Sequence, residues 1–324
     1  MSSLRGAFNE RCTFAQKHET IQSHHQIPDV IVVGEALADV VISREGTFEH
    51  PGGSPANVAY GLGRLGISTT LLTSLGDDER ADGIEAHLRS ADVELLPGSR
   101  GTGRTASAIA TLAADGSARY DFDISWELPP VTPGFLPKIL HTGSIATFLS
   151  PGAASVKALV ERAHRECLVT YDPNIRPAIL RSQAVAKNIF EDFVTFVDVV
   201  KLSDQDAWWL YPGRQLEDIA AHILDLGAEM AVITRGSEGS LLSTADAQVT
   251  IPSVKSVVAD TIGAGDAYMA ALIYGLLTRP TDGLAPALVE RIGRTASKAA
   301  AITVRRPGVN PPTLAELHAD IEEQ

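Results

Sequence analysis

Short apolar runs rich in β-branched residues alternate along the chain with longer segments whose apolar residues recur at helical spacing. The first run, at 29–33, ends at Gly34 and predicts a buried strand. Further strands are predicted over 68–72, 138–141, 168–171, 197–202, 229–234, 240–242 and 248–251. Helices are predicted over 54–65, 77–90, 152–164, 184–194, 216–226, 267–277 and 282–302. This alternation predicts an α/β fold with three α/β/α layers around a mostly parallel central sheet.

Two hairpins interrupt the alternation of strands and helices. One covers residues 36–50, with a polar turn at 44–46. The other joins strand-like segments at 104–112 and 118–122 through Asp115-Gly116, a strong hairpin signal. We expect these insertions, at about 36–50 and 100–124, to form a small separate β-sheet that acts as a lid.

The two ends of the chain differ from the rest of it. Residues 1–28 are polar and lack the apolar region of a signal peptide, so we expect a flexible N-terminal extension. No repeat, linker or low-complexity block follows. The length of 324 residues suits one large α/β domain or two small ones, and the unbroken alternation favours a single domain over residues 29–324.

The charge balance limits the partners that the protein can have. A formal net charge of -13 argues against binding to nucleic acid or to an anionic membrane, and no apolar run is long enough to span a bilayer. It does not exclude a nucleotide substrate, because helix N-termini and a bound metal can hold phosphates locally. The two cysteines, Cys12 and Cys167, indicate no disulfide framework, which fits a reducing cytoplasm.

A glycine-rich turn at 260–266, with the sequence DTIGAGD, opens the predicted helix at 267–277. Unpaired N–H groups and the helix dipole make such a turn an anion site, and Gly263 and Gly265 would let a phosphate approach the backbone. Asp266 adds a carboxylate, which makes sense if it takes a proton from a hydroxyl that attacks phosphorus. The alternative is an ordinary acidic residue that stabilises a helix start.

A second glycine-rich stretch at 51–57, PGGSPAN, begins the helix at 54–65. Ser54 is predicted to cap this helix, with Pro55 as its first residue. Asn57 lies in the first turn, and its amide has both a donor and an acceptor, which suits a neutral hydroxylated ligand.

Polar residues also follow several predicted strands, at the sheet edge where open α/β folds bind ligands. Asp39 lies just past the first strand, although a surface turn explains it equally well. Arg176 is the cation of the rigid loop at 172–177, with a salt bridge within that loop as the alternative. The polar segment 203–206 is usual for a helix cap, yet it can also hold a metal ion through water.

The segment 61–66 matches the GxGxxG pattern of dinucleotide-binding folds. That fingerprint has to follow a strand and open a helix, whereas this segment closes a helix and precedes a strand. We therefore interpret its glycines as small residues that let a helix pack closely on the sheet.

Taken together, the two glycine-rich stretches resemble the paired signatures of the PfkB (ribokinase-like) family of sugar kinases. They occur in the family's order, about two hundred residues apart, and the first continues through Gly66 to Leu75-Gly76-Asp77. The resemblance extends over about residues 30–312 and implies a ribokinase-like fold. It also implies transfer of the γ-phosphoryl group of ATP to a hydroxyl of a small sugar.

The resemblance implies a role for each matching residue. Asp266 matches the catalytic base, and Gly263, Ala264 and Gly265 match the anion hole for the transferring phosphoryl group. The positions that bind sugar hydroxyls match Asp39, Gly53 and Asn57. The nucleotide side would comprise Lys201, Ser203, Thr234, Gly236 and Gly265.

The family also implies cations beside ATP. Its Asn-x-x-Glu motif, which positions Mg²⁺ and phosphate, corresponds to 203–206, where Ser203 replaces asparagine and Asp206 is one methylene shorter than glutamate. Many members bind a monovalent cation near the second motif, which makes Asp260 a candidate ligand for K⁺.

Within the family, the segments at 52–59, 172–177 and 306–312 look most like those of fructokinases, which would place Arg104 and Arg176 near the sugar. Acceptors that remain open are 2-keto-3-deoxygluconate, ribose and a nucleoside. The other alternative is a sugar-binding regulator with weak catalysis. The exposed edges of the lid hairpins make a homodimer a further expectation.

Overall fold

The computed structural model describes residues 27–112, 118–128, 135–180, 182–278 and 283–319. The strands of its main sheet are β1 (Val30–Val33), β4 (Thr69–Leu72), β5 (Glu94–Leu95), β8 (Ile139–Gly143), β9 (Leu168–Asp172), β10 (Val199–Ser203), β11 (Met230–Thr234), β12 (Ser240–Thr244) and β13 (Gln248–Ile251). The sheet has nine strands, in the order β13-β12-β11-β10-β9-β8-β1-β4-β5. All pairings from β5 to β11 are parallel, and β12 and β13 add an antiparallel edge. The predicted mostly parallel sheet is confirmed.

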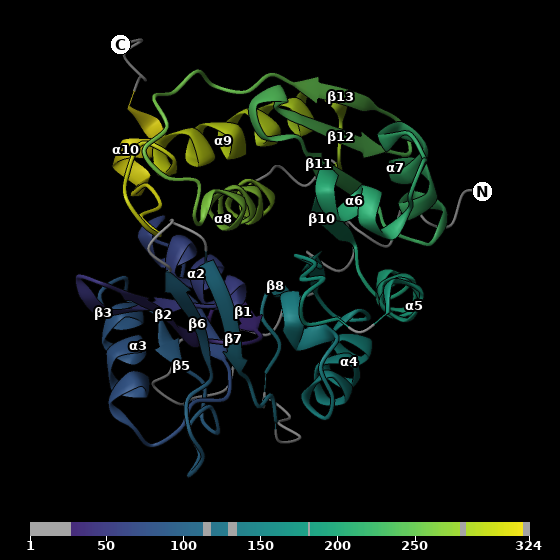
Figure 1. Cartoon of the computed structure of the whole chain (residues 1–324). Helices are drawn as coiled ribbons and strands as arrows, with labels where there is room; N and C mark the ends of the chain where they lie inside the picture. Colours follow the sequence, from purple (N-terminus) through teal and green to yellow (C-terminus); the bar gives the residue numbers. More distant parts are fainter. Residues whose placement is uncertain (1–26, 113–117, 129–134, 181, 279–282, 320–324) are drawn as a thin grey trace.

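Helices cover both faces of this sheet. They are α2 (Ser54–Arg64), α3 (Glu79–Arg89), α4 (Gly152–Ala163), α5 (Gln183–Val194), α6 (Asp204–Leu210), α7 (Leu216–Asp225), α8 (Ala264–Leu277), α9 (Pro286–Thr303) and α10 (Leu314–His318). Two short 3₁₀ turns, η2 (Ser144–Thr147) and η3 (Gly236–Glu238), follow β8 and β11. In Figure 1, α2 and α3 lie to the left of β1 and β8, and α4 and α5 lie to the right.

The two faces of β1 bury their side chains in two different apolar clusters. Val30 and Val32 pack with residues of α2, α3, α8 and α9. Ile31 and Val33 pack with residues of α4, α5, α6 and α7. Because successive side chains of a strand point to opposite faces, a continuous apolar run such as β1 fits only a sheet covered on both sides. The three-layer α/β/α architecture follows directly.

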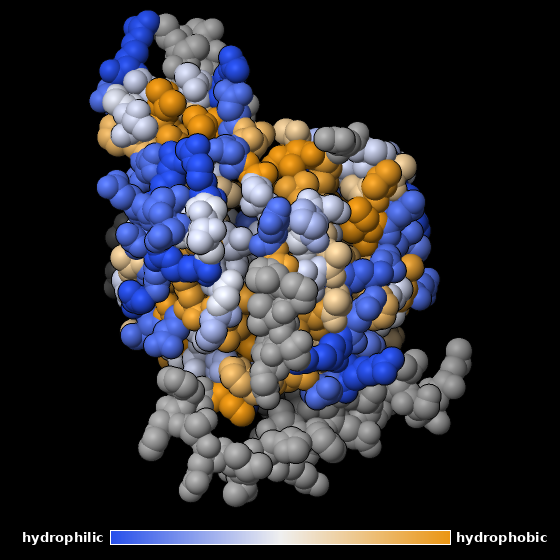
Figure 2. Space-filling model, turned by 90° about the horizontal axis from the view of Figure 1, so that it is seen from below, coloured by the Kyte–Doolittle hydropathy of each residue, from blue (hydrophilic) through white to orange (hydrophobic). Residues whose placement is uncertain are grey.

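The inserted hairpins form a second sheet of their own. Its strands are β2 (Leu37–Ser43), β3 (Gly46–Gly52), β6 (Ser107–Leu112) and β7 (Ala118–Asp123), in the order β3-β2-β6-β7. The parallel pairing of β2 with β6 joins the two hairpins, as predicted for a separate β-sheet. The predicted turn at Asp115-Gly116 lies outside the described residues, as does most of the predicted N-terminal extension. Figure 2 shows one face of the molecule, on which hydrophobic residues are interspersed with hydrophilic ones.

The structure changes two local predictions. Gly53, not Ser54, is the N-cap of α2, with φ at 98°, and Ser54 is the first helical residue. The glycines of the GxGxxG segment do let α2 pack closely, but against α8 and the segment after α3 more than against the sheet. A Cβ on Gly61 would lie 2.9 Å from Ala270 of α8, and one on Gly63 would lie 2.1 Å from the Ala91 carbonyl oxygen.

Within the described ranges, no helix is both long enough and apolar enough to cross a bilayer.

Candidate active site

The N-termini of α2 and α8 meet at one point of the molecule. Each helix follows a glycine with positive φ, Gly53 at 98° and Gly263 at 75°, a conformation that costs other residues free energy. Asp266, in the first turn of α8, contacts the first turn of α2 through hydrogen bonds. The positive ends of two helix dipoles and the free N–H groups of two first turns therefore face a shared space.

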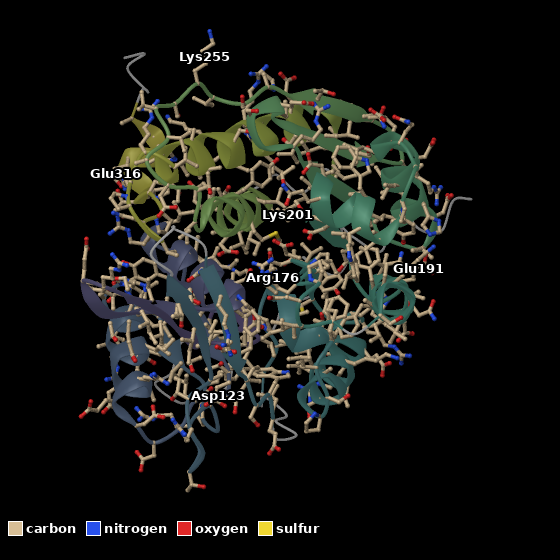
Figure 3. The ribbon with its side chains drawn as sticks, viewed as in Figure 1. Asp123, Arg176, Glu191, Lys201, Lys255 and Glu316 are labelled. Carbon is tan, nitrogen blue, oxygen red and sulfur yellow. The ribbon has the colours of Figure 1, made fainter. Side chains whose placement is uncertain are left out.

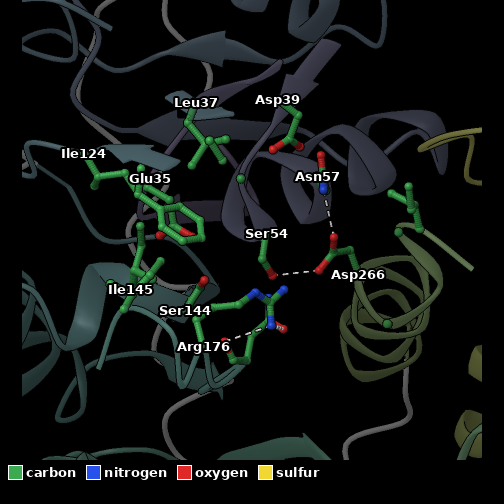
Figure 4. Close-up of a pocket in the computed structure, with 18 of the residues that line it drawn as sticks. Glu35, Leu37, Asp39, Ser54, Asn57, Ile124, Ser144, Ile145, Arg176 and Asp266 are labelled. Carbon is green, nitrogen blue, oxygen red and sulfur yellow. Dashed lines mark hydrogen bonds between the residues drawn. The ribbon is translucent and has the colours of Figure 1, made fainter. Parts of the chain in front are cut away.

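Both carboxylate oxygens of Asp266 accept a hydrogen bond from α2 (Figure 4). Ser54 Oγ donates to Oδ1 at 2.6 Å, and Asn57 Nδ2 donates to Oδ2 at 2.8 Å. Burial raises the pKa of Asp266, and these two bonds and the charge of Lys201 partly oppose that rise. The geometry thus fixes the orientation of a half-buried carboxylate on the wall of the site.

The predicted anion hole at the start of α8 has unequal donors. The N–H of Ala264 donates to the Thr261 carbonyl oxygen at 3.3 Å, which is a long and weak bond. Among the described residues, the N–H groups of Gly265 and Asp266 have no backbone acceptor. These two amides are the clearest anion donors of this helix start.

A pocket of about 380 Å³ lies in front of Asp266. The lid sheet and the residues after it form one wall, with Leu37, Asp39, Ala108, Phe122 and Ile124. The ends of the main strands and the two helix starts form the other walls, with Glu35, Gly53, Ser54, Asn57, Ser144, Ile145, Asn174, Arg176, Ile179, Thr261, Ile262, Gly263, Gly265 and Asp266. The volume falls within the range of small-molecule sites.

Asp39 reaches this pocket from the lid strand β2. Its side chain lies over the backbone of Gly52 in β3, where an added Cβ would be 2.1 Å from Asp39 Oδ2. Asp39 therefore depends on a glycine at position 52 for its place in the pocket.

Arg176 lines the pocket from the loop after β9. Its Nη1 donates to Asn174 Oδ1 at 2.7 Å and more weakly to the backbone oxygens of Asn174 and Ile175. Asn174 itself has a positive φ of 39°. The loop thus holds its own arginine by one nitrogen, and the guanidinium is the positive charge of a pocket that is otherwise acidic. Arg104, the other cation predicted near the sugar, is exposed and does not line the pocket.

Glu35 is a pocket residue that the sequence analysis missed. It lies two residues after the end of β1 and is 3% exposed, and its Oε2 accepts the N–H of Ala146 at 3.1 Å. Burial raises the pKa of Glu35 to about 7, although hydrogen bonds with Ser144 and Ala146 oppose this. Its position after the first strand, four residues before Asp39, is the feature of the sequence that could have identified it as a pocket residue.

The residues predicted to bind the nucleotide cluster at the carboxyl ends of β10 and β11. Ser203 and Thr234 are direct neighbours in the parallel pairing of these strands, and Gly236 begins the turn η3 that follows. Lys201 Nζ lies 3.2 Å from the position that a Cβ of Gly265 would take. The structure therefore brings Lys201 against the start of α8.

A second hollow, of about 390 Å³, borders the turn η3. Ser253 belongs to its wall, and Ser253 Oγ donates to the Ser237 carbonyl oxygen at 2.6 Å. The remaining lining residues come from the same loop and from α9, and they are Ile251, Pro252, Val254, Arg294, Ser297 and Lys298.

Comparison with known proteins identifies the family. The pfkB family carbohydrate kinase pattern matches residues 27–316. The chain belongs to this family. It is accordingly an ATP-dependent carbohydrate kinase.

Among curated proteins, a fructokinase from Rhizobium leguminosarum bv. trifolii is 32% identical over 259 residues, covering 76% of this chain and 79% of that protein. An ATP-dependent 6-phosphofructokinase from Thermoanaerobacterium thermosaccharolyticum is 27% identical over 285 residues, covering 83% of this chain and 85% of that protein. Among solved structures, fructokinase from Vibrio cholerae O395, in its fructose, ADP and calcium ion bound form, has a TM-score of 0.77 at 23% identity. It covers 90% of this chain and 98% of its own. This last likeness confirms the fold.

In this pfkB family kinase, the carboxylates of the two predicted metal ligands, Asp206 and Asp260, already accept backbone hydrogen bonds. Asp206 Oδ1 accepts the N–H of Ile175 at 3.1 Å, and Oδ2 accepts the N–H of Ser203 at 3.2 Å, which completes a capping box for α6. Asp260 accepts the N–H groups of Ile262 at 3.0 Å and Gly308 at 2.9 Å. In the part of the chain that the structure describes, no three acidic, histidine or cysteine residues cluster as a metal site. Each of the two aspartates therefore holds two backbone N–H groups in place.

The pocket assembles most of the sugar side and phosphoryl side that the sequence predicted. Asp39, Gly53, Asn57, Arg176 and Asp266 line one space, together with Gly263 and Gly265. Ser54 and Glu35 belong to the same space but were not predicted as site residues. Ser54 was assigned to helix capping, and that assignment hid its contact with Asp266.

Proposed function

We propose that this kinase transfers the γ-phosphoryl group of ATP to a hydroxyl of a neutral sugar, with fructose as the preferred acceptor and Asp266 as the general base. The observation that carries the proposal is the position of Asp266. It lies where two helix N-termini meet, on the wall of a pocket that the lid sheet closes from the other side.

In the proposed reaction, the acceptor hydroxyl lies against Asp266, which takes its proton as the oxygen attacks the γ-phosphorus. A new O–P bond forms, the bond to the β-phosphate oxygen breaks, and ADP leaves with that electron pair. The amides of Gly265 and Asp266 and the ammonium of Lys201 stabilise the negative charge on the transferring group. With no Walker A lysine motif in the sequence, this helix start takes over the phosphate-binding role.

The charges of the pocket favour a neutral acceptor. Asp39 and Asp266 face it with Arg176 as their counterpart, and Glu35 adds negative charge as its carboxyl ionises near pH 7. A phosphorylated or carboxylated acceptor would meet more like charge than opposite charge, whereas hydroxyl groups can bond both to carboxylates and to the guanidinium. The fructokinases among the relatives support fructose within this class.

We propose that the nucleotide extends from the start of α8 past Ser203 and Thr234 to the turn η3, with its base in the hollow beside Ser253. Ser203 and Thr234 lie side by side on this course, and the Ser253–Ser237 bond connects the turn to the hollow. When bound, the ATP–Mg²⁺ complex supplies the phosphoryl group and neutralises part of its charge.

The geometry limits what the predicted cation residues contribute. Both carboxylate oxygens of Asp206 accept backbone N–H groups, so in this proposal Asp206 contacts Mg²⁺ through a water molecule. The carboxylate of Asp260 is engaged in the same way, which leaves its backbone carbonyl as the ligand for K⁺. A homodimer through the edges of the lid sheet remains part of the proposal.

The test is ADP release from Mg²⁺-ATP with fructose, ribose, 2-keto-3-deoxygluconate, adenosine and fructose 6-phosphate, and without acceptor, each with and without K⁺. We expect strong selectivity for fructose and little ADP without acceptor, because the lid excludes water. Selectivity for an anionic acceptor would overturn the charge argument. Binding of a sugar without any ADP release would favour a sugar-binding regulator.

A further inference from the structure

Ser54 has a hydroxyl that its own helix does not use. The N-cap of α2 is Gly53, and no side chain caps the helix. A serine at the N-cap position would bond the free N–H groups of the first turn, but Ser54 is the first residue inside the helix. Here Ser54 Oγ instead donates to Oδ1 of Asp266, more than two hundred positions away in the sequence.

We propose that Ser54 is a positioning residue for the catalytic base, which holds the carboxylate of Asp266 in its ionised form and in the orientation for proton transfer. The inference rests on the proposed function of Asp266. It adds Ser54 to Gly53 and Asn57, the two residues of the glycine-rich stretch at 51–57 that already belong to the proposed site.

The geometry gives this contact the character of a charge-assisted bond. The O–O distance of 2.6 Å lies in the short range found for hydroxyls that donate to carboxylates. Asn57 donates to the other oxygen at 2.8 Å, so the carboxylate is held at both ends and cannot rotate freely. Each oxygen keeps a lone pair for the acceptor hydroxyl.

The groups around Asp266 explain why the hydrogen bond from Ser54 affects its ionisation. Asp172 disfavours its ionised form, Lys201 favours it, and burial disfavours it most strongly. Asp39 on the lid strand adds a further negative charge that interacts with Asp266. With burial and two carboxylates acting against ionisation, the hydroxyl of Ser54 is one of the few groups that lower the pKa of the base.

The test is the pH dependence of kcat/KM for Ser54→Ala, with the complete chain and the best acceptor of the panel. We expect the acid limb to move upward by roughly one pH unit, from the size of charge-assisted hydrogen bonds. We also expect kcat to fall by about tenfold with little change in the acceptor KM. Ser54→Thr, which keeps the hydroxyl, should return both values toward those of the unchanged protein.

A direct measurement makes the test independent of turnover. The carboxyl carbon of Asp266, labelled with ¹³C and assigned by Asp266→Asn, titrates in the NMR spectrum without any substrate. Its pKa should rise in Ser54→Ala. It should stay unchanged in the control Ser240→Ala, which removes a buried serine hydroxyl that bonds Tyr268 of the same helix α8.

The outcomes separate the inference from the proposed function. An unmoved pKa and pH profile in Ser54→Ala, with only a lower melting temperature, would show a structural role and overturn the inference. If the unchanged protein phosphorylates no acceptor, the proposed function fails. In that case a raised carboxyl pKa in Ser54→Ala still supports the control of Asp266 by Ser54, and an unmoved pKa overturns it.

Discussion

Lys201 Nζ lies 2.8 Å from Oδ2 of Asp172, and both side chains are almost completely buried. The two residues lie one step beyond the paired residues Val200 and Tyr171 of β10 and β9, so the parallel register places them side by side. Burial opposes the charge of Lys201, but Asp172 and two further aspartates outweigh it and raise the pKa of Lys201. The pair therefore keeps a permanent positive charge against the start of α8.

Lys201→Met should leave Asp172 as an uncompensated buried charge. Breaking a buried ion pair on one side costs about 3–5 kcal/mol in the free energy of unfolding, whereas replacing both partners by apolar residues is often nearly neutral. We therefore expect Lys201→Met to be strongly destabilised, and Lys201→Met/Asp172→Leu to recover most of the loss. Urea denaturation measures both differences.

A matched control is Lys255→Met, whose side chain projects outward while that of Lys201 points into the interior (Figure 3). This variant should change the free energy of unfolding by less than about 0.5 kcal/mol. If the double variant is stable but keeps a normal KM for ATP, Lys201 has a purely structural role and leaves the nucleotide site.

Asp266→Asn should fold normally and lose roughly 10²–10⁴-fold or more in kcat, because an amide cannot accept the hydroxyl proton. Binding of the sugar and of ATP, measured by calorimetry, should change little, since the amide retains the shape of the carboxylate and one of its acceptors. A variant with near-normal turnover would remove Asp266 as the base.

The sequence predicted the main sheet because its strands are apolar runs, each bounded by a turn or a glycine. The period of the pattern determined strand or helix, and the structure shifts most boundaries by only a few residues, as in α8, which begins at Ala264 rather than at 267. The two-residue strand β5 and the turn η2 are too short to leave a periodic pattern.

The sequence predicted less of the candidate site, because contacts between residues far apart in the chain determine which side chains meet there. Glycines marked the two helix starts, but no local pattern showed that Ser54 bonds Asp266 or that Glu35 closes the pocket wall. Arg104, which the resemblance to fructokinases would place near the sugar, is exposed and is not among the residues that line the pocket. Local spacing identifies where a helix starts, whereas the residue that contacts this helix start depends on how distant segments pack.

Gly52→Ala should raise the KM for the sugar by severalfold without unfolding the protein. The new methyl group would overlap Oδ2 of Asp39, and the flexible side chain of Asp39 would have to turn away from the pocket. Initial rates at varied sugar and varied ATP separate this effect, because the KM for ATP should stay the same. Gly83→Ala is the matched control, since nothing lies within 4 Å of the Cβ that it adds on α3. Equal sugar KM values for the two variants would show that Asp39 does not contact the acceptor.

Glu35 should make the stability of the protein depend on pH in a window set by its pKa. Burial raises that pKa from 4.5 to about 7, so between these values the native state binds a proton that the unfolded state has lost. The free energy of unfolding therefore falls as pH rises through this window. The stabilisation by the protonated form is complete below about pH 4.5, and about 3 kcal/mol of it is lost by pH 7 and above.

Glu35→Gln isolates this contribution, because glutamine stays neutral at every pH and keeps an acceptor for the N–H of Ala146. Urea denaturation of both proteins between pH 4.5 and 8 gives the difference in free energy of unfolding. We expect the unchanged protein to lose stability relative to the variant as pH rises, so that Glu35→Gln is the more stable protein at pH 8. Parallel curves would mean that Glu35 ionises as easily in the folded protein as in the unfolded chain, and that the pocket wall is more open to water than its 3% exposure indicates.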